Sequence, residues 1–247
     1  MKRNILLQLL ADYLSVADFD DYCVNGLQVE GKSEIGRIAL GVSVSQRLFQ
    51  TAAEWNADAL LVHHGLFWTS DLYPFALRGI QRDRVAILLQ HNINLLGYHL
   101  PLDAHPEVGN NAQLLRILSL TNRASVDVGF LGELEPTMPL KAFVQRVNER
   151  LQTHAFVLPY GSETVRSVAV ISGGSSPKYI KAIEVGADTF VGGDIRESVV
   201  REIEEMRLNY INAGHYPTER LGVQALGKKL EKEFGVETRF IEIHNPV

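Results

Sequence analysis

The sequence predicts an α/β fold of two similar α/β lobes, each with a mixed sheet flanked by helices. Two observations support this prediction. Strand-like and helix-like segments alternate along the chain, which is typical of α/β proteins. The second half also repeats the order of segments, and some of the letters, of the first half, which indicates an internal duplication.

The first half opens with an amphipathic helix, because apolar residues from Ile5 to Tyr13 recur at helical spacing. Ser45 is placed to cap a helix that runs to about Trp55. We expect the other elements of this half to be strands at residues 38–42, 58–62 and 93–97, and helices at residues 83–91 and from residue 111 onward.

The second half repeats this plan. We expect strands at residues 168–172, 189–191, 208–212 and 238–243, and helices at residues 176–184, 195–206 and after Leu221. The connection at 127–163 contains a strand, a turn at Glu135-Pro136 and a helix over Leu140–Leu151, and is too short for an inserted middle domain. The predicted lobes are therefore residues 1–125 and 126–247.

Two pairs of segments show that the amino-acid sequence itself is repeated between the halves. Residues 52–58 (AAEWNAD) align without a gap on residues 182–188 (AIEVGAD). After a loop is shortened, residues 99–103 (HLPLD) fall on residues 215–219 (HYPTE). Both halves thus place a His-x-Pro-x-carboxylate pattern after an apolar strand, and an internal duplication explains the two matches better than chance does.

The composition narrows the functional classes. The 247 residues are 46% hydrophobic with a formal net charge of -5, which gives no electrostatic reason to expect a nucleic-acid partner. Cys23 is the only cysteine, so an intramolecular disulfide and a multi-cysteine zinc site are excluded. No stretch is long and apolar enough for a membrane span, and we expect a cytoplasmic protein without a membrane partner.

The candidate chemistry starts at His63-His64, which follows a strand expected to be buried. Neighbouring strand residues point to opposite faces, so the pair serves two adjacent ions more easily than one. The alternative is one core histidine and one exposed histidine.

His99 and Asp103 stand on either side of Pro101. Because proline is unfavourable within a helix, we expect a rigid extended turn here. A histidine bonded to the backbone and a capping aspartate are the alternatives. His215 and Glu219 repeat the pattern, with Glu219 either a ligand or a helix-starting acid paired with Arg220.

Imidazole and carboxylate groups after three different strands favour a metal site. This mixture suits zinc, manganese, iron, nickel or cobalt, and is too rich in nitrogen for a calcium cage.

Five segments together resemble the NIF-three-like family of dinuclear-metal proteins, whose members are described as homologues of GTP cyclohydrolase 1 type 2. The resemblance covers nearly the whole chain. The segments are residues 25–29 (NGLQV), 58–65 (DALLVHHG), 99–105 (HLPLDAH), 109–111 (GNN) and 214–219 (GHYPTE).

The resemblance implies two divalent metal ions per chain, at a site between the lobes. Its ligands fall on His63, His64, Asp103, His215 and Glu219, with Glu219 bridging the ions. The family also implies a homohexameric ring.

By the same resemblance we expect a hydrolase with a small-molecule substrate, and we favour GTP, whose guanine imidazole ring the enzyme would open. His99 is the expected general acid/base or supporting residue, because its repeat partner His215 is a ligand; His91 and His105 are weaker candidates. The alternative is a non-catalytic ring protein that handles metal or regulates.

Overall fold

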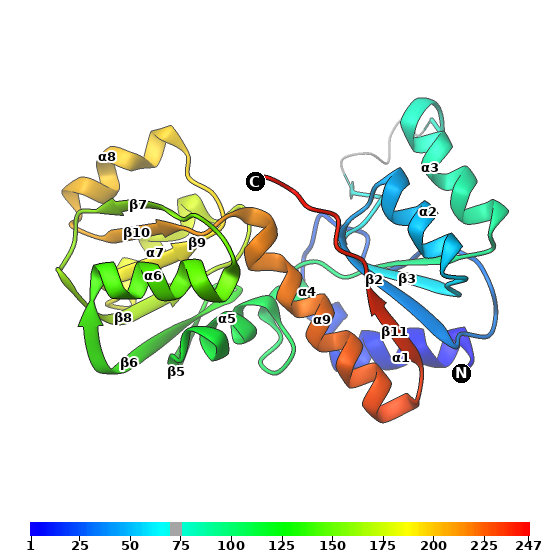
Figure 1. The fold of residues 1–247 in the computed structure, drawn as a ribbon, viewed down its shortest axis with the longest axis horizontal. Helices are drawn as coiled ribbons and strands as arrows, with labels where there is room; N and C mark the ends of the chain where they lie inside the picture. Colours follow the sequence, from blue (N-terminus) through cyan, green and yellow to red (C-terminus); the bar gives the residue numbers. More distant parts are fainter. Residues whose placement is uncertain (70–75) are drawn as a thin grey trace. The chain divides into compact units, whose positions relative to one another are not determined.

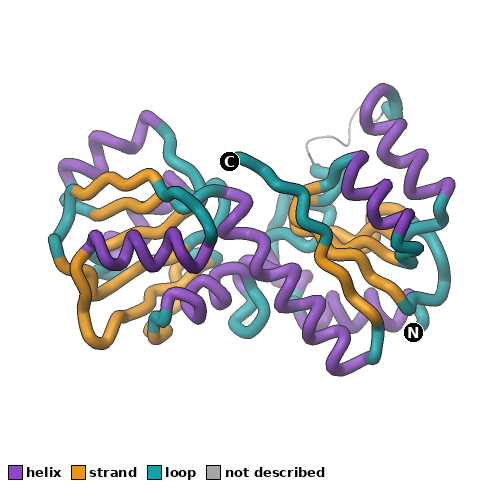
Figure 2. Tube along the Cα trace, in the orientation of Figure 1, coloured by secondary structure: helices purple, strands orange, loops and turns teal. Residues whose placement is uncertain are grey.

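The computed structural model describes residues 1–69 and 76–247, which form two compact units (Figure 1). Unit 1 comprises Met1–Leu102 and Val223–His244, and unit 2 comprises Asp103–Gly222 and Asn245–Val247. Both units combine helices with a sheet (Figure 2), which confirms the predicted α/β class.

Unit 1 contains a five-stranded sheet in the order β1-β4-β3-β2-β11. Three neighbouring pairs are parallel, and the edge strand β1 runs antiparallel to β4. The strands are β1 (Gly26–Val29), β2 (Arg37–Ser43), β3 (Ala59–His64), β4 (Asn94–Gly97) and β11 (Glu237–Phe240).

Helices cover both faces of this sheet. Because strand side chains alternate between the two faces, the sheet can pack against helices on both sides. Leu60 and Val62 share a buried cluster with Leu48 of α2 and Leu88 of α3. Leu40 points to the other face, where a side chain at Gly227 of α9 would meet it. The helices of unit 1 are α1 (Arg3–Tyr13), η1 (Val16–Asp18), α2 (Gln46–Glu54), α3 (Gly79–Gln90) and the last part of α9 (His215–Phe234).

Unit 2 contains a six-stranded sheet in the order β5-β6-β8-β9-β10-β7. Its centre, β8-β9-β10, is parallel, and the outer strands pair antiparallel. The strands are β5 (Thr121–Val126), β6 (Gly129–Pro139), β7 (Phe156–Pro159), β8 (Thr164–Val170), β9 (Thr189–Gly192) and β10 (Asn209–Asn212).

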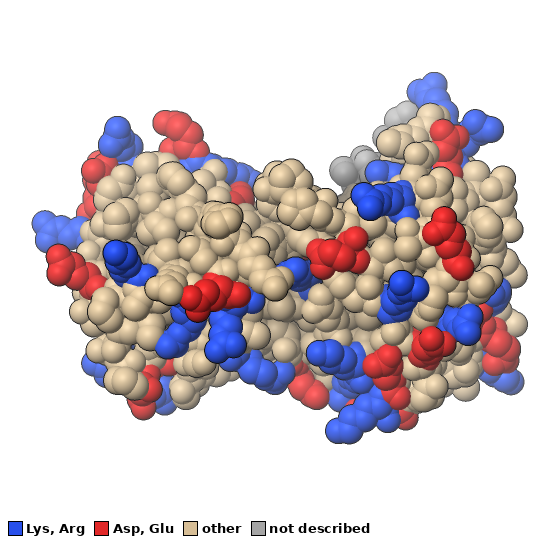
Figure 3. Space-filling model, in the orientation of Figure 1, with Lys and Arg blue, Asp and Glu red and all other residues tan. Residues whose placement is uncertain are grey.

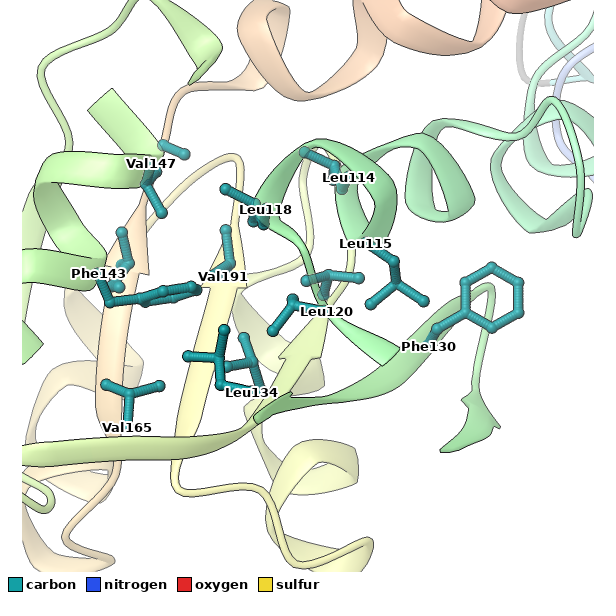
Figure 4. Close-up of a cluster of buried hydrophobic side chains, with 14 of the residues drawn as sticks. Leu114, Leu115, Leu118, Leu120, Phe130, Leu134, Phe143, Val147, Val165 and Val191 are labelled. Atoms are coloured by element: carbon teal, nitrogen blue, oxygen red, sulfur yellow. The ribbon is translucent and has the colours of Figure 1, made fainter. Parts of the chain in front are cut away.

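Two buried clusters lie on the opposite faces of the second sheet. On one face Val191 packs with Leu115 of α5 and Phe143 of α6 (Figure 4). On the other face Phe190 packs with Ala182 of α7 and Ile203 of α8. The helices of unit 2 are α5 (Asn110–Leu118), α6 (Leu140–Leu151), η3 (Ser176–Lys178), α7 (Tyr179–Glu184) and α8 (Glu197–Glu205).

The hydrogen bonds support the duplication at two matched positions. Asp58 Oδ2 accepts from the backbone N–H groups of residues 36 and 37, and Asp188 Oδ2 accepts from those of residues 166 and 167. Asn94 accepts from Gly31 N–H and donates to the carbonyl of Lys32, as Asn209 does with Gly161 and Ser162. In each unit the aspartate bonds to the backbone at or near the neighbouring strand, and the asparagine bonds to the loop before that strand.

The prediction of an extended turn around Pro101 was wrong. Leu100–Ala104 forms a short helix, α4, and α9 begins at His215 rather than after Leu221. Both prolines stand in the first helical turn, where the backbone N–H has no helical acceptor and its loss costs little.

The compact units do not coincide with the sequence halves 1–125 and 126–247. Residues 103–125 fold with unit 2, and Val223–His244 folds with unit 1. The reason is that β11 pairs in parallel with β2 of unit 1, so the end of the chain completes the first sheet.

The surface carries mixed charge. Lys/Arg and Asp/Glu side chains are interspersed over each unit on the face drawn in Figure 3. Within the described ranges 1–69 and 76–247, no helix combines the length and apolar character of a membrane span.

Candidate metal centre

Three histidines come together in unit 1 after two adjacent parallel strands. His63 and His64 end β3, and His99 lies two residues beyond the end of β4. One ring nitrogen of each lies within 4.8 Å of those of the other two. Binding groups commonly collect at such strand ends. This group includes His99, which the sequence analysis did not assign as a ligand.

Hydrogen bonds orient the first two imidazoles. His63 is completely buried, and its Nδ1 lies 3.0 Å from the carbonyl oxygen of Tyr98. Because a carbonyl only accepts, Nδ1 of a neutral His63 carries the proton and Nε2 the lone pair. His64 Nδ1 lies 2.9 Å from Ser43 Oγ on the neighbouring strand β2.

His99 is oriented by a residue that the sequence analysis missed, Asp21. The two form a pair with Nδ1 of His99 2.9 Å from Oδ1 of Asp21, and both side chains are buried. Burial raises the pKa of Asp21, but hydrogen bonds from His99, the Cys23 backbone and Asn25 outweigh it and lower the pKa to about 2. Asp21 is thus an anion that holds Nδ1 of His99 as a donor.

The 25–29 segment braces this histidine group. The His99 N–H donates to Asn25 Oδ1 at 2.8 Å. Gln28 Oε1 accepts from the N–H groups of Leu66 and Phe67, in the turn that follows His64. A side chain at Gly65 would collide with the Gln28 amide, which explains why glycine follows the two histidines.

In unit 2 Asp103 is held by a buried polar network. Its side chain is buried, and Oδ1 accepts from Asn110 Nδ2 at 2.8 Å and from Ser172 Oγ at 2.9 Å. The side chain of Asn111 fixes the backbone of Asp103 and of Ser172. Asn110 therefore fixes the carboxylate of Asp103 and Asn111 its backbone.

His215 and Glu219 form the second half of the unit 2 group. They lie one turn apart at the start of α9, with Nε2 and Oε2 separated by 3.1 Å. A carboxylate oxygen of Glu219 also lies within 4.8 Å of one of Asp103. Glu219 is 2% exposed and Asp103 4% exposed, so two buried acids stand together, and such a pair favours a cation.

Gly173 leaves space at this acid pair. Its φ is +64°, and a side chain there would collide with Glu219 Oε1 and approach His215 Nε2 to 3.2 Å. Only glycine fits this left-handed, crowded position without strain.

The donor set fits a borderline divalent metal. Unit 1 offers three imidazoles, and unit 2 offers two carboxylates and an imidazole. Such nitrogen and oxygen ligands suit zinc and its neighbours in the first transition series. The structure does not bring His91 or His105 into these groups: His91 is exposed at the end of α3, and His105 Nδ1 accepts from the backbone of Glu107 and Val108.

Comparison with known proteins places the chain in a family. The model of the family Duf34/NIF3 (NGG1p interacting factor 3) matches residues 1–246. A "GTP cyclohydrolase 1 type 2 homolog" of Yersinia pestis is 42% identical over 255 residues, covering 99% of each chain. One of Haemophilus influenzae with the same description is 41% identical over 252 residues, covering 100% of each.

Solved structures agree with these matches. A protein described as ybgI, of unknown function, superposes with a TM-score of 0.96 at 39% identity. TTHA1606 of Thermus thermophilus superposes with a TM-score of 0.93 at 37% identity. Both matches cover 100% of each chain. The resemblance drawn from the sequence motifs is confirmed, and the chain belongs to the Duf34/NIF3 family.

Proposed function

We propose that this protein is a metal-dependent hydrolase that opens the imidazole ring of a purine nucleotide, with GTP as the first candidate substrate. The observation that carries the proposal is the group of three imidazoles at the ends of β3 and β4, each within 4.8 Å of the others. The description of the relatives as GTP cyclohydrolase 1 type 2 homologues supports the choice of substrate.

The proposal assigns ligand roles to His63 and His64 of unit 1 and to Asp103, His215 and Glu219 of unit 2. That both groups serve one dinuclear centre, with Glu219 shared by the ions, is part of the proposal. Divalent ions held by these residues would supply activated water near neutral pH and stabilise negative charge on the substrate.

His99 is the proposed general acid/base. Its Nδ1 is engaged with Asp21, so Nε2 can accept a proton from water or deliver one to the leaving ring nitrogen. Asp21 fixes the tautomer and stabilises the protonated ring. The same geometry allows His99 to bind metal instead, and the two roles predict different results on substitution.

The test is turnover of GTP by protein loaded with a defined metal, followed as released formate and ring-opened product. His99→Gln is expected to lower kcat by about 10²–10⁴-fold and to retain the metal. His91→Gln, at the exposed end of α3, is the matched control and is expected to keep full activity. Loss of metal from His99→Gln would assign His99 as a ligand.

Metal content tests the ligand set separately. Elemental analysis is expected to find two ions per chain, and fewer after Glu219→Ala. Retention of both ions would contradict the shared role of Glu219. No turnover of GTP or other purine nucleotides, together with readily exchanged metal, would favour metal handling over catalysis.

We further propose a homohexameric ring in the cytoplasm, as the family resemblance implies. Light scattering of the purified 27.5 kDa chain tests the assembly directly, and a monomeric or dimeric mass would contradict it.

A further inference from the structure

Two large aromatic side chains border His99 in unit 1. The ring centroids of Tyr22, Trp68 and His99 form a nearly equilateral triangle, with sides of 5.1, 5.3 and 5.4 Å. Tyr22 and Trp68 are stacked at 27°, and both stand nearly perpendicular to the imidazole, at 71° and 78°. Trp68 also lies 6.1 Å from His64. The candidate metal-binding group thus has an aromatic border.

Backbone pairing holds the two aromatic residues in place. The segment 22–24 lies antiparallel to the segment 67–69, with a bridge between Cys23 and Trp68. The Thr69 N–H donates to Tyr22 O at 2.7 Å, and the Val24 N–H donates to Phe67 O at 3.1 Å. Gln28 bonds to both segments. The rings therefore stand on a backbone that is fixed before any ligand arrives.

Tyr22 remains 59% exposed despite these contacts. A tyrosine of the hydrophobic core would be largely covered, whereas an aromatic side chain that receives a ligand must offer a face to solvent. Trp68 is half-buried behind it. The ring centroid of this exposed tyrosine lies 5.1 Å from that of His99, the proposed catalytic histidine.

We propose that Tyr22 and Trp68 form a stacking platform for a planar nitrogen heterocycle and position its ring against His99. This proposal rests on the proposed function for the identity of the ring, a purine. Flat heteroaromatic rings gain affinity by stacking on tyrosine and tryptophan, whatever their hydrogen-bonding edges. The platform would thereby select the class of substrate, while the metal-binding residues act on it.

The platform is tested by binding, without reference to turnover. Trp55→Phe leaves Trp68 as the single tryptophan, because the chain contains two. This variant, loaded with zinc, is titrated with GTP while tryptophan fluorescence is recorded. We expect GTP to quench Trp68, and inorganic triphosphate, which has no ring, to leave it unchanged.

Substitution of Tyr22 supplies the affinity test. Tyr22→Leu is expected to weaken GTP binding about tenfold, within the range for loss of one base–aromatic stack. Its zinc content and urea midpoint should stay those of the parent variant. Tyr22→Phe should restore affinity, because it keeps the ring. Phe156→Leu, which removes a 53% exposed aromatic side chain from β7, is the matched control and should bind GTP normally.

The outcomes separate this proposal from the hydrolase proposal. Unchanged affinity in Tyr22→Leu, or no quenching by GTP, overturns the platform. Quenching that follows protein concentration rather than nucleotide also overturns it, since it indicates a contact between copies of the chain. Turnover of GTP with an unchanged KM in Tyr22→Leu leaves the hydrolase standing without the platform. Tyr22-dependent binding without turnover leaves the platform standing without the hydrolase.

Discussion

Asp21 ties two distant segments of unit 1 together through one buried carboxylate. It accepts hydrogen bonds from the Cys23 N–H and the Asn25 side chain on its own segment. From the start of α4 it accepts from His99 Nδ1 and the Leu100 N–H. Since both oxygens of Asp21 are used and the group is a buried anion, removal of its charge should disturb the position and the tautomer of His99.

Asp21→Asn is therefore expected to lower the free energy of unfolding by about 1–3 kcal/mol, the usual cost of leaving a buried hydrogen-bonding group without its partner. The amide would place an NH₂ group where His99 or Leu100 needs an acceptor. Urea unfolding measures this effect. Asp12→Asn, at an exposed site bonded to Gln8, is the control and should change the free energy by less than about 0.5 kcal/mol. Equal effects of both substitutions would contradict the role of Asp21.

The residues predicted from sequence are those with a local signature. His63-His64 follows an apolar strand, and His99 and His215 recur in a repeated motif. Asp21 has no such signature, because it lies in an irregular segment 78 positions before His99. Its role depends on a tertiary contact, which neither periodicity nor spacing reveals.

At the scale of elements, the His-x-Pro-x-acid motif is a helix start. In α9 it places His215 and Glu219 one turn apart on the same face. Pro217 stands where no N–H is needed. In α4 the acid of the motif, Asp103, lies in the first turn, where the helix dipole favours negative charge. The repeated letters are visible in the sequence, but proline disfavours a helix interior and not its first turn, which is why the sequence predicted extended turns where α4 and α9 begin.

Gly173 offers a test of the crowding at the start of α9. Gly173→Ala is expected to displace Glu219 and reduce bound metal, because the new methyl group would occupy the site of Oε1. Elemental analysis of zinc-loaded protein measures this loss. Gly186→Ala is the matched control, since Gly186 is also left-handed, at φ +78°, but a side chain there meets nothing within 4 Å.

Both substitutions should share the left-handed backbone cost of about 1–2 kcal/mol. Only Gly173→Ala should lose metal. Normal metal content in that variant would show that Glu219 can move aside without loss of binding.

The Asp58 carboxylate, which lies just before β3 and bonds to the start of β2, should make the free energy of unfolding depend on pH. Burial raises its pKa, but hydrogen bonds from Lys32 and the backbone of residues 36 and 37 outweigh this and hold the pKa below the usual value of an aspartate. A depressed folded-state pKa contributes stability that is complete above the unfolded value and lost as the pH falls below it. The stabilisation by Asp58 should therefore be constant from about pH 5 to 7 and decline below about pH 4.

Asp58→Asn is expected to cost about 1–2 kcal/mol at pH 7, since the amide keeps one accepting oxygen but loses the ion pair with Lys32. The difference from the unsubstituted protein should shrink in urea unfolding below about pH 4. Asp83→Asn, at an exposed site on α3, serves as the control. If this difference in the free energy of unfolding grew as the pH fell, the predicted direction of the pKa shift of Asp58 would be wrong.

At the scale of the whole molecule, the fold class and the duplication were predictable but the unit boundaries were not. Alternation of strands and helices is a local property, and the repeated letters mark equivalent positions such as Asp58 and Asp188. Unit membership depends on which sheet a strand joins. The pairing of β11 with β2 links segments about two hundred residues apart, and no pattern within Glu237–Phe240 specifies its partner.

The proposed metal ligands are divided between the two units, and this division predicts which segments bound metal should stabilise. If one dinuclear centre uses both groups, metal should protect both units from hydrogen exchange. On zinc addition to stripped protein, we expect slower exchange in β3 and α4 and in the first turns of α9. Glu219→Ala should reduce the protection of β3 although the substitution lies in unit 2. Protection of β3 that survives Glu219→Ala would instead indicate two independent sites, one histidine-rich and one acidic, and each unit would then bind its own ion.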